Sequence, residues 1–195
     1  MKSSSKLFFI LALSMAIMVA ISNFLVQFPF NFFSMGEILT YGAFSYPITF
    51  LITDLSNRSF GKQVAKKIVY LGFIVGVLLT LFLSTNFTDI ISIRIAVGSG
   101  SAFIIAQLID VQVFDKLRRR IWFIAPFVSS FVGSFIDTMI FFFIAFYNTD
   151  VSWISLAVGD FSIKILMSVI MLIPFRLLLN KIKDFSTEGR SLTSV

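Results

Sequence analysis

The sequence predicts an all-α integral membrane protein: a bundle of six transmembrane helices with both termini in the cytoplasm. Composition is the first reason, because 57% of the 195 residues are hydrophobic, only 13% are charged, and the mean hydropathy is +0.96. A typical soluble domain is about 45–50% apolar and about 25% charged. The other two reasons are the long apolar stretches and the placement of basic residues between them.

Each transmembrane helix needs about 20 mostly apolar residues, because one residue advances an α-helix by about 1.5 Å. The first candidate stretch follows Lys2 and Lys6, as in a cleaved signal peptide, but no small-residue cleavage site follows it, so we expect a retained helix. The second and third candidates are short or polar at one end. The predicted spans are Leu7–Phe28, Ile38–Ser56, Ile68–Leu83, Ile93–Phe114, Ile121–Tyr147 and Trp153–Leu179.

Charged residues between these spans fall into two groups that alternate along the chain. Basic residues concentrate in cytoplasmic loops, so the basic group marks the cytoplasmic side. The acidic group comprises Glu37, Asp89 and Asp150, with Arg94 at a span edge. The alternation supports six spans, since one missed span would invert the downstream pattern. The basic group comprises Lys2, Lys6, Arg58, Lys62, Lys66, Lys67, Lys116, Arg118, Arg119, Arg120, Lys181, Lys183 and Arg190.

The sequence shows no separate soluble domain. We expect residues 1–180 to form a single six-helix transmembrane domain. Residues 181–195 are polar, and we expect them to form a disordered cytoplasmic tail.

The residue types present exclude several classes of function. The chain has no cysteine and no histidine, which excludes disulfides, thiolate or histidine-based catalysis and the usual zinc sites. We expect no metal and no cofactor. A Walker A pattern is also absent, so nothing predicts ATP hydrolysis by this chain. The net charge of +6 is explained by the basic loops, and we do not expect nucleic-acid binding.

Small residues indicate where helices approach closely. Gly72 and Gly76 form a G-x-x-x-G pattern in the third span, and Gly98, Ala102 and Ala106 form a small-residue ridge in the fourth. Such ridges allow helix backbones to pack tightly in lipid. We expect them to pack within the chain, and the alternative is a dimer seam.

Ionisable residues inside the predicted spans are the main candidates for function. Asp110, Asp137, Asp160 and Lys164 interrupt stretches that otherwise read as lipid-facing. A charge in mid-bilayer costs about 2.5–3.5 kcal/mol on insertion scales, so each of these residues needs a partner, a water-filled cavity or a ligand. They therefore predict a polar site within the bundle.

Helical spacing indicates which polar residues can meet. The rise of the helix places Asp137 and Lys164 about 15–16 Å, and Asp160 about 10 Å, from the outer ends of their spans, so these three can come together. Ser134 shares the helix face of Asp137. Two further residues are closer to the cytoplasmic side: Asp110, and Gln107 one turn deeper.

Several of these residues also have purely structural explanations. Asp160 and Lys164, four residues apart, can simply neutralise each other. Ser134 can bond a carbonyl of its own helix. Asp137 has no cation within one turn of its own helix, which makes it the strongest functional candidate. Ion pairs with arginines near the cytoplasmic side can explain two more acids: Asp54 with Arg58, and Asp110 with Arg118 or Arg119.

Three segments place polar residues at fixed positions within apolar sequence. They are SYPITFLITDLSNRSFG (45–61), SAFIIAQLIDVQVF (101–114) followed by Leu117 and Arg118, and APFVSSFVGSFIDTMIFFFIAF (125–146). These segments resemble signatures of the queuosine precursor transporter family, a branch of the vitamin uptake transporters. Lys164 and Pro174 also fit its last span. The likeness extends over residues 40 to 180, roughly, and such ordered motifs are more specific than hydropathy alone.

The resemblance implies an uptake transporter of the bacterial inner membrane that imports a 7-deazaguanine, either a queuosine precursor or the free base queuine. We expect Asp137 to accept hydrogen bonds from the donor edge of the base, Gln107 to bond another edge, and Lys164 to donate to the carbonyl or to neutralise charge. Asp110 would support the site or an inner gate. The full predicted substrate-binding set is Asp137, Gln107, Lys164, Asp110, Asp54 and Ser134.

Three rival functions stay open on sequence alone. One is the substrate-binding subunit of an energy-coupling-factor transporter, which needs ATP-driven partner proteins. The second is an intramembrane enzyme, which the lack of His and Cys disfavours, as do the different depths of Asp110 and Asp137. The third is a structural scaffold, which would not need polar groups in several spans. We therefore predict a transporter, not an enzyme, with a small nucleobase-like substrate and an undetermined oligomeric state.

Overall fold

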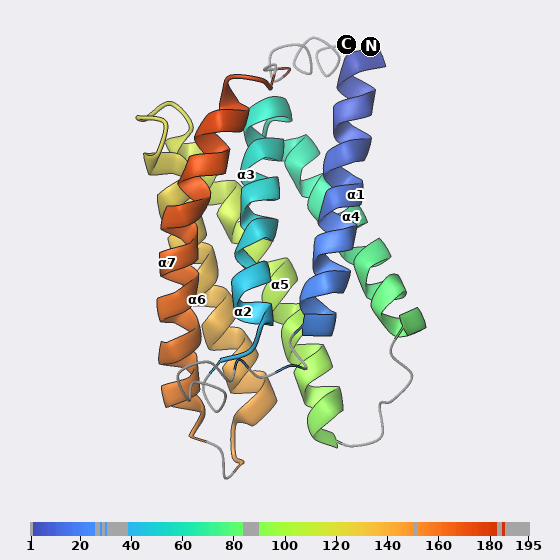
Figure 1. Cartoon of the computed structure of the whole chain (residues 1–195), viewed down its shortest axis with the longest axis vertical. Helices are drawn as coiled ribbons and strands as arrows, with labels where there is room; N and C mark the ends of the chain where they lie inside the picture. Colours follow the sequence, from blue (N-terminus) through green and yellow to red (C-terminus); the bar gives the residue numbers. More distant parts are fainter. Residues whose placement is uncertain are drawn as a thin grey trace.

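The computed structural model describes residues 2–25, 28, 30, 39–83, 90–149, 152–182 and 185. Within this part of the chain every regular element is an α-helix, which confirms the all-α prediction. Figure 1 shows the long helices side by side in one elongated bundle. In chain order they are α1 Lys2–Leu25, α2 Gly42–Ser45, α3 Pro47–Phe60, α4 Lys62–Leu83, α5 Ile90–Leu117, α6 Ile124–Phe146 and α7 Trp153–Leu179.

The short helix α2 leads directly into α3. Tyr46, between them, keeps helical dihedral angles of −57° and −42°, and its amide donates to Gly42 O. Pro47 has no amide hydrogen and therefore interrupts the backbone hydrogen bonding while it starts α3. The two helices together thus cross much of the bundle as one interrupted element.

Four helices of the described chain are long and apolar enough to cross a bilayer, judged by length and composition alone. They are α1, α5, α6 and α7, over Ser4–Leu25, Ile93–Leu117, Ile124–Phe146 and Trp153–Leu179. Helix α3 has only 14 residues, about 21 Å of helix against a hydrocarbon core of about 30 Å. The protein therefore has several membrane-spanning helices, and the count of six stays a prediction.

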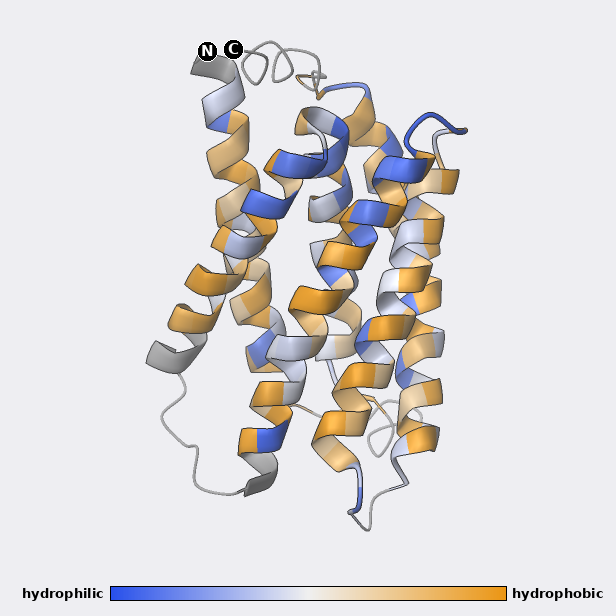
Figure 2. Cartoon of the chain, turned by 180° about the vertical axis from the view of Figure 1, so that it is seen from behind, coloured by the Kyte–Doolittle hydropathy of each residue, from blue (hydrophilic) through white to orange (hydrophobic). Residues whose placement is uncertain are grey.

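Basic side chains collect at one end of the bundle, which we call the basic end. In Figure 1 this is the upper end, where α1 begins and α3, α5 and α7 finish, and Figure 2 shows many hydrophilic residues in the helix turns at this end. At the other end, Arg94 of α5 donates to the backbone oxygens of Ile144 and Tyr147 at 2.9 and 2.7 Å. The acids expected at that end, Glu37, Asp89 and Asp150, lie outside the described residues, as do Lys183, Arg190 and nearly all of the predicted tail.

The connection between α3 and α4 corrects one prediction. Lys62, Lys66 and Lys67 were expected in a connecting segment before Ile68, but they lie in the first turns of α4, and α3 extends past Ser56 to Phe60. The chain reverses at Gly61 alone, with a φ of 81° that glycine adopts without steric penalty. Lysine stems can lie along apolar surface while their ammonium groups reach water, so the helix can start within the basic sequence.

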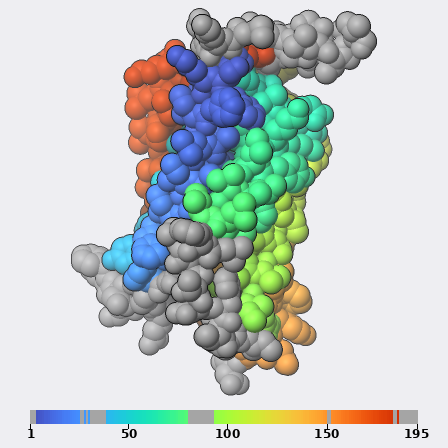
Figure 3. Space-filling view, turned by 90° about the vertical axis from the view of Figure 1, so that its right-hand side faces the viewer, coloured from blue at the N-terminus to red at the C-terminus, as the bar shows by residue number. Residues whose placement is uncertain are grey.

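Helices α1 and α4 meet at the predicted G-x-x-x-G pattern. A Cβ atom at Gly76 would lie 2.7 Å from the Val19 side chain, and one at Gly72 would overlap Met15 of α1. Figure 3 shows the two helices, blue and green, packed against each other on this face. The pattern therefore serves packing within the chain, as expected.

This seam gives a prediction about stability. Gly76→Ala adds a methyl group where Val19 leaves no space, and overpacking of this kind costs about 1–3 kcal/mol. Thermal unfolding in detergent should therefore occur at a lower temperature. Gly100→Ala is the matched control, since its nearest neighbour would be Phe73 at 3.6 Å, an ordinary contact. Equal melting temperatures for the two variants would contradict the tight α1–α4 seam.

Candidate functional site

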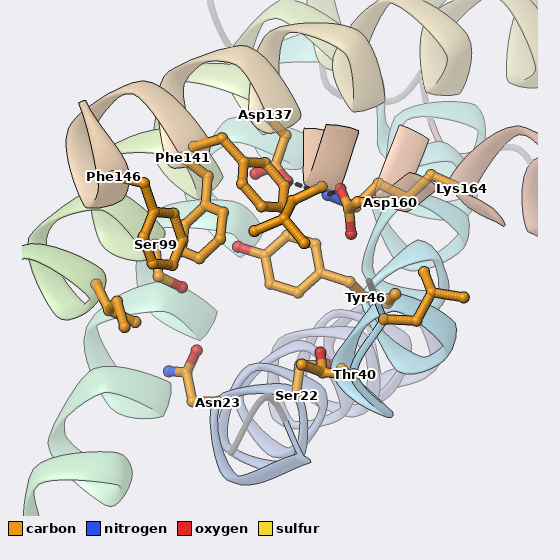
Figure 4. Close-up of a pocket in the computed structure, with 16 residues that line it drawn as sticks. Ser22, Asn23, Thr40, Tyr46, Ser99, Asp137, Phe141, Phe146, Asp160 and Lys164 are labelled. Atoms are coloured by element: carbon orange, nitrogen blue, oxygen red, sulfur yellow. Dashed lines mark hydrogen bonds and ion pairs between the residues drawn. The ribbon is translucent and has the colours of Figure 1, made fainter. Parts of the chain in front are cut away.

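A cavity of about 210 Å³ lies between the helices, away from the basic end. Its wall is formed by the C-terminal halves of α1 and α6, the N-terminal halves of α5 and α7, and α2 with its flanking residues. Figure 4 shows charged groups on one side and the polar residues Ser22, Asn23 and Thr40 across from them. The lining residues are Ser22, Asn23, Leu39, Thr40, Gly42, Ala43, Tyr46, Ile95, Ser99, Asp137, Phe141, Phe142, Phe146, Leu156, Asp160 and Lys164.

Three charged side chains meet in the wall of this cavity. Lys164 Nζ of α7 lies 2.8 Å from Asp137 Oδ2 of α6 and 2.5 Å from Asp160 Oδ2, one turn earlier on α7. We call these residues the ion triad. Thr138 of α6 hydrogen-bonds to two members of the ion triad: its hydroxyl donates to Asp160 Oδ2 at 2.8 Å and accepts from Lys164 Nζ at 3.2 Å. The side chain of Lys164 is 5% exposed, so the ammonium depends on these partners rather than on water.

The ion triad has more acid than base. With all three groups ionised, two carboxylates face one ammonium, which gives the wall of the cavity a net negative charge. Asp137 Oδ1 is buried and accepts no hydrogen bond from any described residue. Leaving a buried acceptor unpaired costs free energy. Because Asp137 lines the cavity, a donor on a bound molecule can supply the missing hydrogen bond.

Aromatic rings form much of the remaining wall. The Tyr46 ring centroid lies 5.5 Å from Lys164 Nζ, a distance at which the ring face stabilises the ammonium. Phe141, Phe142 and Phe146, from the last turns of α6, add apolar surface. Figure 4 shows Tyr46 on one side of the cavity, with Phe141 and Phe146 on another. The cavity thus combines hydrogen-bond acceptors with flat apolar surfaces.

A second polar cluster lies closer to the basic end and does not line the cavity. Its centre is the acid pair, Asp54 of α3 and Asp110 of α5, which lie next to each other between two contacts of these helices, Thr53 with Gln107 and Asn57 with the Val111 oxygen. They are 2% and 0% exposed. Ser129 and Ser130 of α6 donate to the two Asp54 oxygens at 3.1 and 3.5 Å. Gly133 lets α6 come this close, because a Cβ there would lie 2.6 Å from Phe50 and 3.4 Å from Asp110.

Gln107 belongs to this second cluster. Its Oε1 accepts from Thr53 at 2.5 Å, and its Nε2 donates to Thr49 at 2.8 Å. The side chain is fully buried, so both ends of the amide connect α5 to α3. In this structure Gln107 therefore acts as a link between two helices.

The structure divides the predicted site residues between these two places. Asp137 and Lys164 meet in the cavity, as their predicted depths allowed. Asp54, Asp110 and Gln107 lie in the second cluster. Direct contact of these three residues with a substrate stays a prediction. The role of Ser134 also stays a prediction, because this residue does not line the cavity and its buried hydroxyl has no partner among the described residues.

The structure also decides the purely structural explanations for the acids. Asp160 and Lys164 form the expected ion pair, but Asp137 shares the lysine. Asp54 does not pair with Arg58, because Arg58 and Arg118 donate to each other's backbone oxygens at 3.1 and 2.6 Å. Asp110 accepts no hydrogen bond from any described arginine. Both expected arginine pairings are thus wrong.

Several cavity residues are absent from the set that the sequence predicts. The first span carries no diagnostic motif, yet α1 contributes Ser22 and Asn23 to the wall. Two adjacent polar residues in an apolar helix are a usable signal. Tyr46 and Ser99 are also missing from the predicted set, although Tyr46 lies inside the segment 45–61 that carries the family resemblance.

Comparison with known proteins identifies the family. A family model described as "Putative vitamin uptake transporter" matches residues 40–179. The chain belongs to this family. "Queuosine precursor transporter" of Escherichia coli is 34% identical, over 90% of this chain and 87% of that protein, and "Probable queuosine precursor transporter" of Haemophilus influenzae is 31% identical over 87% of each. A Bacillus subtilis protein with the latter name is 33% identical over 43% of this chain and 44% of its own length. No solved structure matches the chain.

Membership of this family confirms two predictions. The chain is an uptake transporter with a small-molecule substrate, and it is not an enzyme. A member of an uptake transporter family with several helices long and apolar enough to cross a bilayer is a multi-pass membrane protein. The names of the relatives give no support to a subunit that needs separate ATP-driven partners.

The ion triad gives a second stability prediction. Lys164→Met leaves Asp137 and Asp160 facing each other without a cation, and breaking a buried ion pair in this way costs about 3–5 kcal/mol. We expect a marked drop in melting temperature in detergent. Adding Asp137→Asn to this variant removes one of the stranded charges and should recover part of the loss. A single variant as stable as the parent protein would show that the ammonium is not held by these acids.

Proposed function

We propose that this protein imports a queuosine precursor or a related 7-deazaguanine base, and that the cavity beside the ion triad binds it. The observation that carries the proposal is the combination of an unpaired buried carboxylate oxygen on Asp137 with aromatic walls in one cavity. Similarity to transporters named for queuosine precursors supports the choice of substrate class.

The acids match the donor edge of a deazaguanine. Such a base carries a ring N–H and an amino group side by side and a carbonyl on the neighbouring edge. A carboxylate can accept both hydrogen bonds of the donor edge. The three hydrogens of the Lys164 ammonium already serve Asp137, Asp160 and Thr138, so Lys164 donates to the carbonyl by exchanging one of these partners for the substrate. A site built this way rejects analogues that lack these groups, because its own polar atoms are then left unpaired.

The walls and the size of the cavity match a small flat ligand. Drug-sized molecules occupy pockets of roughly 300–1,000 Å³, and this cavity measures about 210 Å³. It therefore suits a single bicyclic base better than a nucleoside or a larger cofactor. Tyr46, Phe141 and Phe146 offer ring faces against which such a base can stack.

The experiment measures uptake and binding separately. Purified protein in liposomes, without any ATP-driven partner, should take up tritiated 7-deazaguanine or tritiated queuine, and a queuosine-deficient bacterial host that expresses the chain should recover queuosine in its tRNA. Asp137→Asn should weaken binding at least tenfold, because loss of one charge-assisted hydrogen bond is worth about 1.5–3 kcal/mol.

The matched control is Asp115→Asn, at the basic end of α5 and away from the cavity, which should bind and transport normally. Unchanged affinity of Asp137→Asn would remove this residue from the site. Uptake that appears only when ATP-driven partner proteins are supplied would favour a subunit of the energy-coupling-factor type.

The orientation belongs to the same proposal. We infer six membrane-crossing segments, with the basic end in the cytoplasm of a bacterial inner membrane, because basic residues favour that side. The cavity then lies in the outer half of the bilayer.

The lack of cysteine in the sequence makes this orientation directly testable. A single cysteine at Asn148, between α6 and α7, should react with a membrane-impermeant maleimide added to intact cells. A single cysteine at Arg119, between α5 and α6, should react only after the membrane is opened. The reverse labelling pattern would invert the proposed topology.

A further inference from the structure

The acid pair is the feature that substrate binding leaves unexplained. Asp54 of α3 and Asp110 of α5 lie side by side in the interior, 2% and 0% exposed. Contacts between the two helices flank them on both sides, since Thr53 donates to Gln107 and Asn57 donates to the backbone oxygen of Val111. Neither residue lines the cavity. Two like charges in a buried site without a compensating cation cannot both persist, because the low dielectric strengthens their repulsion.

No described basic group neutralises the pair. No described lysine or arginine forms an ion pair with either acid, and α6 contributes the hydroxyls of Ser129 and Ser130 to Asp54. The nearby arginines, Arg58 and Arg118, donate to each other's backbone oxygens. The remaining basic residues of the adjoining elements bind other groups or lie near the basic end. Lys164 belongs to the ion triad, Arg176 lies over the Trp122 ring, and Arg94 of α5 donates to the backbone oxygens of Ile144 and Tyr147. The others lie near the basic end: Lys116 in the last turn of α5, and Lys6, Lys62, Lys66 and Lys67 in the first two turns of α1 and α4.

The acid pair lacks a hydrogen-bond donor for Asp110. Asp54 accepts from Ser129 and Ser130, but neither oxygen of Asp110 accepts a hydrogen bond from a described donor. The Ser129 hydroxyl has one hydrogen, and its acceptors within hydrogen-bond distance are Asp54 Oδ1 at 3.1 Å and Pro126 O at 3.3 Å, so it does not serve Asp110. Asp110 therefore lacks a described donor, and a proton held between the two neighbouring carboxyl groups would give both residues a hydrogen bond.

We propose that Asp54 and Asp110 share one exchangeable proton, and that this proton drives uptake by entering from the outer side with the substrate and leaving to the cytoplasm. The coupling half of this proposal depends on the proposed function, whereas the shared proton does not. A proton suits this place better than a metal ion, because it needs only two facing oxygens and no cavity. Among the described residues no group of three or more acids, cysteines or histidines is arranged to hold a metal.

A polar stripe on α6 connects the acid pair with the cavity. Ser130 touches Asp54, Asp137 belongs to the ion triad, and Ser134 lies between them, one helical turn from each. The Ser134 hydroxyl is 1% exposed and has no partner among the described residues. A buried hydroxyl can both accept and donate a proton, so Ser134 is placed to relay one when the helices admit water.

The first test detects the proton itself and needs no transport. Infrared difference spectroscopy of the purified protein at neutral pH, with and without exchange into heavy water, should show the carbonyl band of a buried protonated carboxyl group. Asp54→Asn and Asp110→Asn should each remove the band at its original frequency, because the proton is then no longer shared between two carboxyl groups. If burial keeps the remaining acid protonated, its carbonyl band should appear at a different frequency, since its hydrogen-bond partner is now an amide. Asp115→Asn, the control on the same helix as Asp110, should keep it. Absence of the band in the parent protein, or its persistence in both variants, would overturn the proposal.

The second test measures coupling in liposomes with tritiated 7-deazaguanine. Each pH unit of inward proton gradient should raise accumulation by up to about tenfold if one proton moves with each base. Asp54→Asn and Asp110→Asn should accumulate no more base with the gradient than without it, and melting curves in detergent check that both variants fold. Asp115→Asn should respond as the parent protein does.

The possible outcomes separate the two proposals. Downhill uptake that ignores a proton gradient, or that responds to a sodium gradient instead, overturns proton coupling and leaves the proposed function intact. Variants of the acid pair that still concentrate the base under a proton gradient also overturn it. Failure of the parent protein to exchange the base at all would remove the proposed function and the coupling role together, with the infrared band still deciding whether the pair holds a proton.

Discussion

The position of Lys164 between two carboxylates is the interaction on which the site depends. Its ammonium is buried, and in a membrane interior an unpaired charge is expensive. Asp160 neutralises it from the same helix, and Asp137 does so from α6, so the charges fix how α6 and α7 lie against each other. The excess acid then gives the cavity its polarity. One arrangement of charges therefore stabilises the helix pair and prepares the site.

Helix α6 carries both polar clusters. Its face toward the bundle interior presents Ser129 and Ser130 to the acid pair, Ser134 one turn on, and Asp137 and Thr138 to the ion triad. The helical rise makes the depths agree: Asp54, Asp110 and Ser129 each lie about 8–10 Å from the ends of their helices at the basic end. Any movement of α6 relative to its neighbours changes the surroundings of both clusters at once. The geometry of both clusters therefore depends on the position of the same helix, α6.

Local sequence rules were sufficient for part of this arrangement. Hydropathy predicted the all-α class. Helical rise predicted that Asp137 and Lys164 could meet, because the depth of each residue depends only on its distance from the end of its own helix. The contact between Asp54 and Asp110 could not be predicted in the same way, because it depends on how α3 and α5 are aligned with each other. Gln107 shows the same limit, since its partners Thr49 and Thr53 lie on α3. The early start of α4 was missed because a single glycine replaced an expected loop.

Unpaired polar atoms in the described interior follow a direction through the bundle. Asp137 Oδ1 lies at the cavity, and Ser134 and Asp110 follow toward the basic end, with Asn57 Oδ1 and Ser59 Oγ near the close of α3. Native proteins leave few buried polar groups unsatisfied, and in lipid no bulk water is present to offset this cost. Random packing faults would not be ordered from one end to the other. Polar atoms in a line are what the proposed passage of substrate and protons requires, because each group that crosses the bundle needs hydrogen-bond partners along the way.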